Sequence, residues 1–89
     1  MSPYIPHDRR NELTRTKGNP KTPGELNYFL TQEVLGYIYQ AQSQNHFFRS
    51  YSLYNEVIGV LECMKQEIYR RLIVPFEDDK CGKNGDVFQ

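Results

Sequence analysis

Apolar residues recur at steps of three and four through the second half of this 89-residue chain, and this spacing constrains the fold most strongly. On a helix that turns about 100° per residue they form one broad stripe, which consists of Tyr54, Val57, Ile58, Leu61, Met64, Ile68, Leu72 and Phe76. The stripe predicts a helix from about Leu53 to about Asp79, with Ser50 or Ser52 as its cap. Because Pro75 lacks an amide hydrogen and its ring clashes with the preceding turn, we expect the helix to kink or end there.

A second helix is predicted by a capping signal that precedes another apolar stripe. Thr22 can cap the helix, Pro23 suits the first helical position, and Glu25 completes a capping box with Thr22. The stripe that follows is expected to be core, and its members are Leu26, Phe29, Leu30, Val34, Tyr37, Ile38 and Ala41. The polar segment 40–45 is expected to end this helix.

The remaining segments are short. Residues 7–16 predict a short helix that depends on Leu13 for tertiary contact, and residues 17–21 predict a loop. Residues 80–89 contain Asn84-Gly85, a turn signal, and are expected to form a turn and a tail in which Val87 and Phe88 fold back. The sequence therefore predicts an all-α fold. We expect one small domain over residues 1–89, with two main antiparallel helices, a short N-terminal helix and extended termini.

The face opposite the stripe on the C-terminal helix is unusually apolar for a solvated surface. It carries Gly59, Val60, Cys63, Gln66, Arg70, Ile73 and Val74. We expect part of this face to be shielded, either by the N-terminal segment with Tyr4 and Ile5 or by a second copy of the chain. Both covers remain open.

Composition narrows the classes of function. The 11 Lys and Arg residues balance the 11 Asp and Glu residues, which argues against a nucleic-acid or membrane-surface partner. There is no apolar run long enough for a membrane span. Cys63 lies in the middle of the predicted helix and Cys81 past its end, which is too far apart for a disulfide, and we expect a cytoplasmic location. His7 and His46 show no metal-ligand spacing with the cysteines, so neither a metal site nor a cofactor is expected.

An ordered set of motifs spans nearly the whole chain. They include Pro3-Tyr4-Ile5-Pro6 with Arg9-Arg10, Pro23-Gly24-Glu25-Leu26-Asn27-Tyr28, Tyr54-Asn55-Glu56-Val57-Ile58-Gly59, Tyr69-Arg70-Arg71 and Asn84-Gly85-Asp86-Val87. With these motifs the chain resembles a family of uncharacterised short proteins found in bacteria and phages. The resemblance implies one compact domain and no assigned activity. The chain departs from the family at Phe76, where Tyr is common.

Tyr69, Arg70 and Arg71 form the most suggestive group of side chains. Arginine binds phosphate or carboxylate oxygens with two parallel hydrogen bonds, and tyrosine can stack on a base. A nucleotide is a ligand that uses both. The plain alternative for Arg71 is a surface ion pair with Glu67, four residues earlier.

Arg9 and Arg10 have two interpretations. They can match the acidic residues 77–79 within the chain, or they can join Arg70 and Arg71 in a pocket shared between subunits. Tyr28 lies in the first turns of the second helix, where free amide groups can hold an anion. Its neighbour Asn27 should have a side-chain hydrogen bond, because asparagine inside a helix competes for the backbone.

No catalytic motif is present, so we do not expect an enzyme. The leading hypothesis is a non-catalytic homo-oligomer that holds a small nucleotide-type anion at an interface pocket. The expected ligand-binding residues are Arg9, Arg10, Tyr28, Tyr69, Arg70 and Arg71. By analogy with compact phage proteins, such a protein would sequester an immune nucleotide as an anti-defence sponge. The alternative is a protein-interaction module that docks on a host or phage protein through the outer face of the C-terminal helix.

Overall fold

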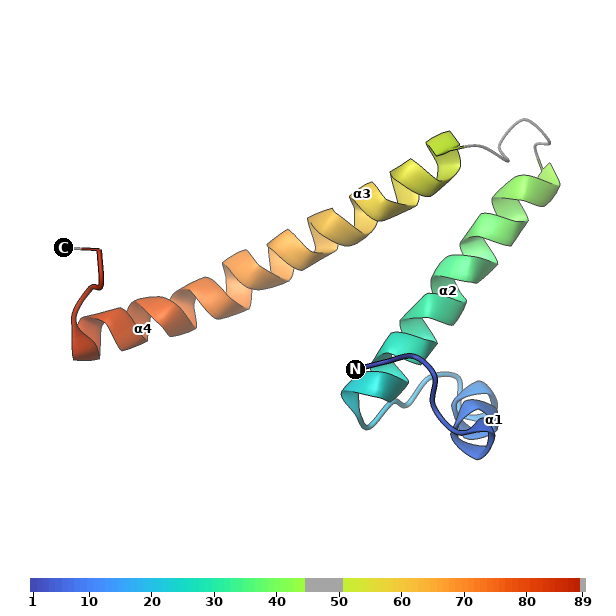
Figure 1. The fold of residues 1–89 in the computed structure, drawn as a ribbon, viewed down its shortest axis with the longest axis horizontal. Helices are drawn as coiled ribbons and strands as arrows, with labels where there is room; N and C mark the ends of the chain where they lie inside the picture. Colours follow the sequence, from blue (N-terminus) through green and yellow to red (C-terminus); the bar gives the residue numbers. More distant parts are fainter. Residues whose placement is uncertain (45–50, 89) are drawn as a thin grey trace. The chain divides into compact units, whose positions relative to one another are not determined.

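All regular secondary structure in the computed structural model is helical over residues 1–44 and 51–88, which are the residues it describes. The elements are α1 (His7–Arg15), α2 (Pro23–Gln44), α3 (Tyr51–Ile68), the π-helical turn η2 (Tyr69–Ile73) and α4 (Val74–Asn84) (Figure 1). This confirms the predicted all-α class. The chain divides into two units, residues 1–53 and residues 54–89. No helix in the described ranges combines the length and apolar content that a membrane span requires.

The first unit is organised by the contact between α1 and the beginning of α2. Leu13 of α1 is only 2% exposed, which confirms its predicted role as the anchor of a short helix. A Schellman closure ends α1, because the Gly18 amide donates to the Leu13 carbonyl at 2.9 Å and the Lys17 amide donates to the Thr14 carbonyl at 3.4 Å. Both Lys17 (φ 56°) and Gly18 (φ 88°) have left-handed backbone conformations. This closure turns the chain toward α2.

The N-terminal segment is tied to the first turns of α2. Asn27 donates from Nδ2 to the Met1 carbonyl at 2.7 Å, and its Oδ1 accepts a hydrogen bond from Thr31 at 3.0 Å. These bonds confirm that Asn27 has side-chain partners. The Ser2 carbonyl and the Ile5 side chain lie so close to Gly24 that a Cβ there would come within 2.9 Å of the carbonyl oxygen. Residues 1–5 therefore pack on α2. They include Tyr4 and Ile5, which were predicted as one possible cover for the C-terminal helix.

The predicted start of α2 is confirmed, whereas its predicted end is wrong over residues 40–44. The helix begins at Pro23 and runs through Gln44. It continues over residues 40–44 because Gln and Ala favour helix and these five residues include no Gly or Pro. Asn45 and Ser50 lie outside the described residues. The expectation that the α2 stripe is core also fails in the single chain, since Leu26 and Tyr37 are exposed.

The second unit is dominated by one uninterrupted helical rod, α3–η2–α4 (Figure 1). The predicted long helix is confirmed, but it continues to Asn84 beyond the expected end at Asp79. Ser52 lies inside α3, so it is not the cap. Gly85 (φ 89°) ends the rod and donates its amide to the Cys81 carbonyl at 2.8 Å. The helix therefore ends at Gly85, whereas the sequence predicted a turn that begins at residue 80.

The tail after the rod lies beside the last turns of α4. Val87 and Phe88 line an open hollow of about 450 Å³ together with Glu77 and Cys81 of that helix. Both apolar side chains are nevertheless almost fully exposed, so the tail does not bury them.

Pro75 is accommodated by the π-helical turn that precedes it. The Val74 amide donates to the Tyr69 carbonyl, five residues back, which is the π-helical pattern. In a regular α-helix the Pro75 ring would meet the Arg71 carbonyl. The wider turn relieves that clash, and the helix continues past Pro75 as α4 instead of ending there.

The stripe of the C-terminal helix is exposed at most of its positions, including Tyr54 and Ile58, although it was predicted to be core. Val57 is buried at 8% exposure, and beyond it the exposed fractions are 42% for Met64, 49% for Ile68, 68% for Leu72 and 61% for Phe76. The opposite face is also exposed at Val60, Cys63 and Val74, so the second unit by itself does not shield it.

Candidate functional site

The predicted ligand-binding residues fall into two groups, one in each unit. Arg9 and Arg10 of α1 lie near Tyr28 of α2 in the first unit. Tyr69, Arg70 and Arg71 are consecutive residues of η2 in the second unit. Each group is described separately.

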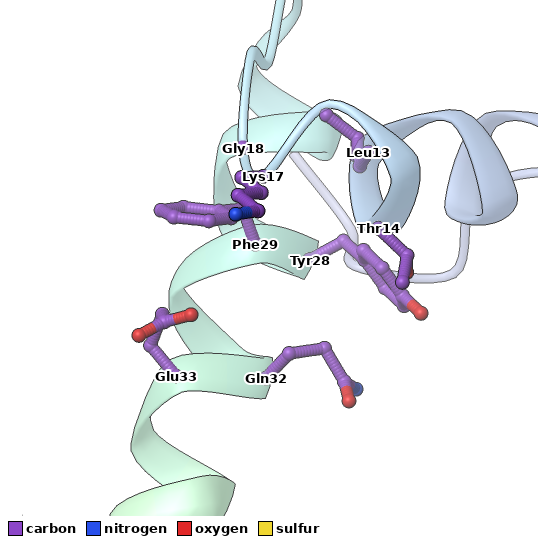
Figure 2. A pocket seen from close by; sticks show the side chains of 8 residues that line it. All are labelled: Leu13, Thr14, Lys17, Gly18, Tyr28, Phe29, Gln32 and Glu33. Carbon is purple, nitrogen blue, oxygen red and sulfur yellow. The ribbon is translucent and has the colours of Figure 1, made fainter.

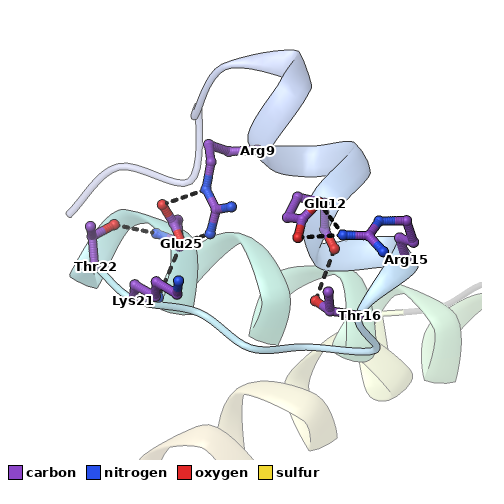
Figure 3. A network of polar contacts seen from close by, with 7 residues as sticks. All are labelled: Arg9, Glu12, Arg15, Thr16, Lys21, Thr22 and Glu25. Atoms are coloured by element: carbon purple, nitrogen blue, oxygen red, sulfur yellow. Dashed lines mark hydrogen bonds and ion pairs between the residues drawn. The ribbon is translucent and has the colours of Figure 1, made fainter.

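Arg9 is engaged by Glu25 in the most buried ion pair of the described residues. The Arg9 guanidinium donates from Nε to Glu25 Oε2 at 3.0 Å and from Nη2 to Oε1 at 2.5 Å (Figure 3). The Lys21 amide also donates to Glu25 Oε1, at 3.0 Å. The Arg9 hydrogen bonds, followed by the Lys21 amide, lower the pKa of Glu25 to about 2. Glu25 is only 8% exposed, so this carboxylate joins α1, the loop and α2.

This geometry bears on two predictions. Arg9 pairs with Glu25 within the first unit, a partner that the sequence did not suggest. Thr22 does cap α2, because its Oγ1 accepts the Glu25 amide hydrogen at 3.2 Å. The Glu25 side chain, however, binds the Lys21 amide, one residue before the position that a capping box would use. The attraction of Arg9 is sufficient to account for this displacement.

Arg10 lies over the Tyr28 ring, with its guanidinium carbon 5.4 Å from the ring centroid. Its Nε donates to the Ile5 carbonyl at 2.8 Å. Both Arg10 and Tyr28 are half-buried. Arg10 therefore connects α1, α2 and the N-terminal segment, and the sequence could not predict this stacking because it depends on how α1 packs.

An open hollow of about 490 Å³ lies beside this pair, between α1, the loop and α2 (Figure 2). Its lining residues are Leu13, Thr14, Lys17, Gly18, Tyr28, Phe29, Gln32 and Glu33. Tyr28 was predicted as a ligand residue, whereas Lys17, Gln32 and Glu33 were not. The four-residue steps from Tyr28 to Gln32 and from Phe29 to Glu33 could have placed these side chains together on α2. Their opposition to α1 depends on tertiary packing.

In the second unit, Arg70 and Arg71 share one carboxylate oxygen. Arg70 Nη2 and Arg71 Nε donate to Glu67 Oε1 at 2.7 Å and 2.8 Å. The predicted pair of Glu67 with Arg71 is confirmed, whereas the pairing of Arg70 was missed because its acid lies three residues back rather than four. These side chains are exposed, so the ion pairs are weak and open to competition.

Tyr69 and Arg70 line a shallow hollow of about 380 Å³ on the same helix. Its other lining residues are Glu62, Lys65, Gln66 and Val74. Glu62 and Lys65, which are three residues apart on this helix, form an ion pair at 3.3 Å. Because one helix supplies all these residues, a ligand in this hollow would have no opposing wall. A second surface is needed to enclose it.

Other chemistry has little support in the described part of the chain. Cys63 and Cys81 are free and exposed. Residues 1–44 and 51–88 contain no group of three or more His, Cys, Asp or Glu side chains arranged to hold a metal ion.

The fold and these groups define a small all-α protein with exposed arginine and tyrosine side chains. The chain belongs to the family described as a domain of unknown function, DUF6899, whose sequence model matches residues 1–87. This confirms the resemblance to an uncharacterised family. No curated protein and no solved structure matches the chain.

Proposed function

We propose that this protein is a non-catalytic binding protein that works as an assembly of copies, which are joined through the C-terminal helix. The contact surface is the apolar line, defined as Met64, Ile68, Leu72 and Phe76. The exposure of this line in the single chain is the observation that carries the proposal.

The energetic argument rests on the amount of apolar surface that the line leaves in water. Burying one such side chain fully contributes about 1.5–3 kcal/mol. The side chains of the line are between 42% and 68% exposed, so covering all of them contributes several kcal/mol per chain, which is about the stability of a small domain. A partner that covers the line would also support a helix that gains little from tertiary packing in its own unit.

The assembly would also supply the missing wall for an anionic ligand. Arg70 lies two residues from both Ile68 and Leu72 and is on the opposite face, but Tyr69 follows Ile68 and Arg71 precedes Leu72, so Tyr69 and Arg71 flank the line at its middle. A chain packed on the line would therefore lie next to these side chains. Their arginine forks and tyrosine ring suit a nucleotide-type anion, which would compete with Glu67 for the arginines. Binding without turnover is what a phage anti-defence sponge requires.

Sedimentation equilibrium of the full chain, at micromolar to hundreds of micromolar concentration, tests the association. We expect a mass of at least two chains for the original protein and for the control Gln66→Glu, because Gln66 lies away from the line. Ile68→Glu, which puts a charge within the line, should give the mass of one chain. If the original protein has the mass of one chain at every concentration, the association is refuted.

Calorimetry with cyclic nucleotides and ADP-ribose derivatives tests the ligand. We expect binding by the original protein and a loss of affinity in Arg70→Ala with Arg71→Ala. The absence of heat with every ligand at tens of micromolar would remove the ligand from the proposal and leave the association standing.

A second candidate is the protein-interaction module that docks on a different protein. The exposure of Val74, an apolar residue on the face opposite the line, favours it. A monomer whose line and opposite face both exchange amide hydrogens freely would support this candidate over the assembly of copies.

A further inference from the structure

We infer that a second copy of this chain packs on the apolar line in an antiparallel orientation. The twofold axis crosses the line between Ile68 and Leu72, at the height of Arg70 along the helix. The inference rests on the proposed association and specifies its geometry. It follows from three features of the rod: the straightness of the line, its symmetry and the charges on its two sides.

The π-helical turn keeps the apolar line straight. The members of the line are four residues apart, and each four-residue step overshoots an α-helical turn by about 40°, so the line would drift by roughly 120° from Met64 to Phe76 in a uniform α-helix. The turn η2 spans Tyr69–Ile73 and contains more residues per turn, so it removes most of this drift. The line therefore stays on one side of the rod, where a straight partner helix can contact it.

The apolar line matches itself when one copy is reversed about Arg70. Met64 then lies at the height of Phe76 of the second copy, and Ile68 at the height of Leu72 of the second copy. Each pair occurs twice, which is the arrangement of an isologous twofold interface. Large side chains thus meet along the whole exposed part of the line, and none of its members faces a gap.

The charges beside the line also favour the antiparallel arrangement. Glu67 and Arg71 each precede a member of the line, so they lie on one side of it. Lys65 and Glu77 each follow a member, so they lie on the other side. In an antiparallel pair, matching sides of the two copies face each other. Glu67 then lies within about one turn of Arg71 of the second copy, and Lys65 lies similarly near Glu77 of the second copy. Each of these attractive contacts occurs twice, whereas one repulsive contact forms, because the two Arg71 side chains also come within about one turn of each other.

A parallel pair satisfies fewer of these charges. In that orientation the two different sides face each other at equal height. Arg71 would face Tyr69 and Ile73 of the second copy, without an acid, and the favourable contact left to this pair would join Glu67 to Lys65 of the second copy. Asp79, which precedes Lys80 on the side of Arg71, would lie near Glu77 of the second copy, and like charges in contact destabilise an interface. Charge complementarity therefore selects the antiparallel pair.

The two natural cysteines allow a direct measurement of orientation. Spin labels on the exposed Cys63 in Cys81→Ser, and on Cys81 in Cys63→Ser, give the distance between equivalent positions by double electron–electron resonance. With the axis at Arg70, the two Cys63 positions are offset by 14 residues, or about 21 Å along the rod. The two Cys81 positions are offset by 22 residues, or about 33 Å. We expect the Cys81 distance to be the longer.

Two results would refute the antiparallel pairing about residue 70 and leave the association of two copies in place. Equal short distances for both labels would show a parallel pair. A Cys63 distance longer than the Cys81 distance would show an antiparallel pair with a different axis. A monomer in sedimentation would instead refute the proposed association itself.

A charge exchange provides a second readout. Glu67→Arg places basic residues opposite Arg71 of the second copy, and Arg71→Glu places acidic residues opposite Glu67 of the second copy. Each variant alone should associate more weakly, whereas an equimolar mixture should recover association because each basic pair then faces an acidic pair. Circular dichroism controls for helix content in the variants. No recovery in the mixture, with helix content unchanged, would refute the antiparallel pairing.

Discussion

Gly18→Ala should destabilise the first unit for two separate reasons. Gly18 has φ 88°, and a residue with a Cβ loses about 1–2 kcal/mol in the left-handed region. The new Cβ would also overlap the Phe29 ring, lying 2.5 Å from Cζ and 2.7 Å from Cδ1. Displacing a packed ring costs about 1–3 kcal/mol. We expect a combined loss of about 2–5 kcal/mol.

Gly36→Ala is the matched control in the same unit. Gly36 lies inside α2, and an added Cβ would meet nothing within 4 Å, so this substitution should stabilise the helix by up to about 1 kcal/mol. Amide hydrogen exchange in α1 is a suitable assay, because the exposed rod dominates whole-chain circular dichroism. A loss of 2 kcal/mol corresponds to exchange about 30-fold faster. Unchanged or slower exchange of α1 in Gly18→Ala would refute the packing of Gly18 against Phe29.

Three further predictions concern the two units. Lys17→Gly should stabilise α1 by roughly 1 kcal/mol, because Lys17 has φ 56° without the freedom of glycine, and slower exchange of α1 would show it. The Glu25 pKa is lowered from 4.5 to about 2, so its contribution to stability is complete above pH 4.5 and is lost as the pH falls toward 2. The protection factors of the α1 amides, which are corrected for the pH dependence of intrinsic exchange, should fall over that window. Glu25→Gln should reduce this dependence to the part that Glu12, whose pKa Arg15 also lowers, contributes. Pro75→Ala should allow η2 to become α-helical, which raises the helix content measured by circular dichroism. The same change rotates Phe76 away from Ile68, so association of the copies should weaken. Unchanged association would count against the role of the π-helical turn.

Local signals in the sequence predicted the elements of this fold well. The cap at Thr22, the first-turn proline at Pro23 and the glycine at Gly85 act through neighbouring backbone groups, so their effects can be read from short segments. The apolar spacing of the C-terminal helix likewise predicted its existence. The π-helical turn was not predicted, because Pro75 offers several local solutions and the sequence does not rank them.

Tertiary consequences were predicted less well. The two apolar stripes indicated a shared core, yet periodicity shows only that a face is apolar and does not identify what covers it. The site shows the same limit. The pair of Glu67 with Arg71 follows from helical spacing, whereas the pair of Arg9 with Glu25 joins residues 16 apart across a loop. Such a contact depends on how α1 packs on α2.

The π-helical turn η2 holds one residue more than an α-helical turn would, so the rod should tolerate the loss of one residue at this place. If Pro75 were replaced, deleting a single residue between 69 and 73 would leave an ordinary α-helix in which the side chains before and after the deletion still share one side. A deletion elsewhere in the rod would rotate every later residue by about 100°. Homologues one residue shorter should therefore have lost that residue within this turn.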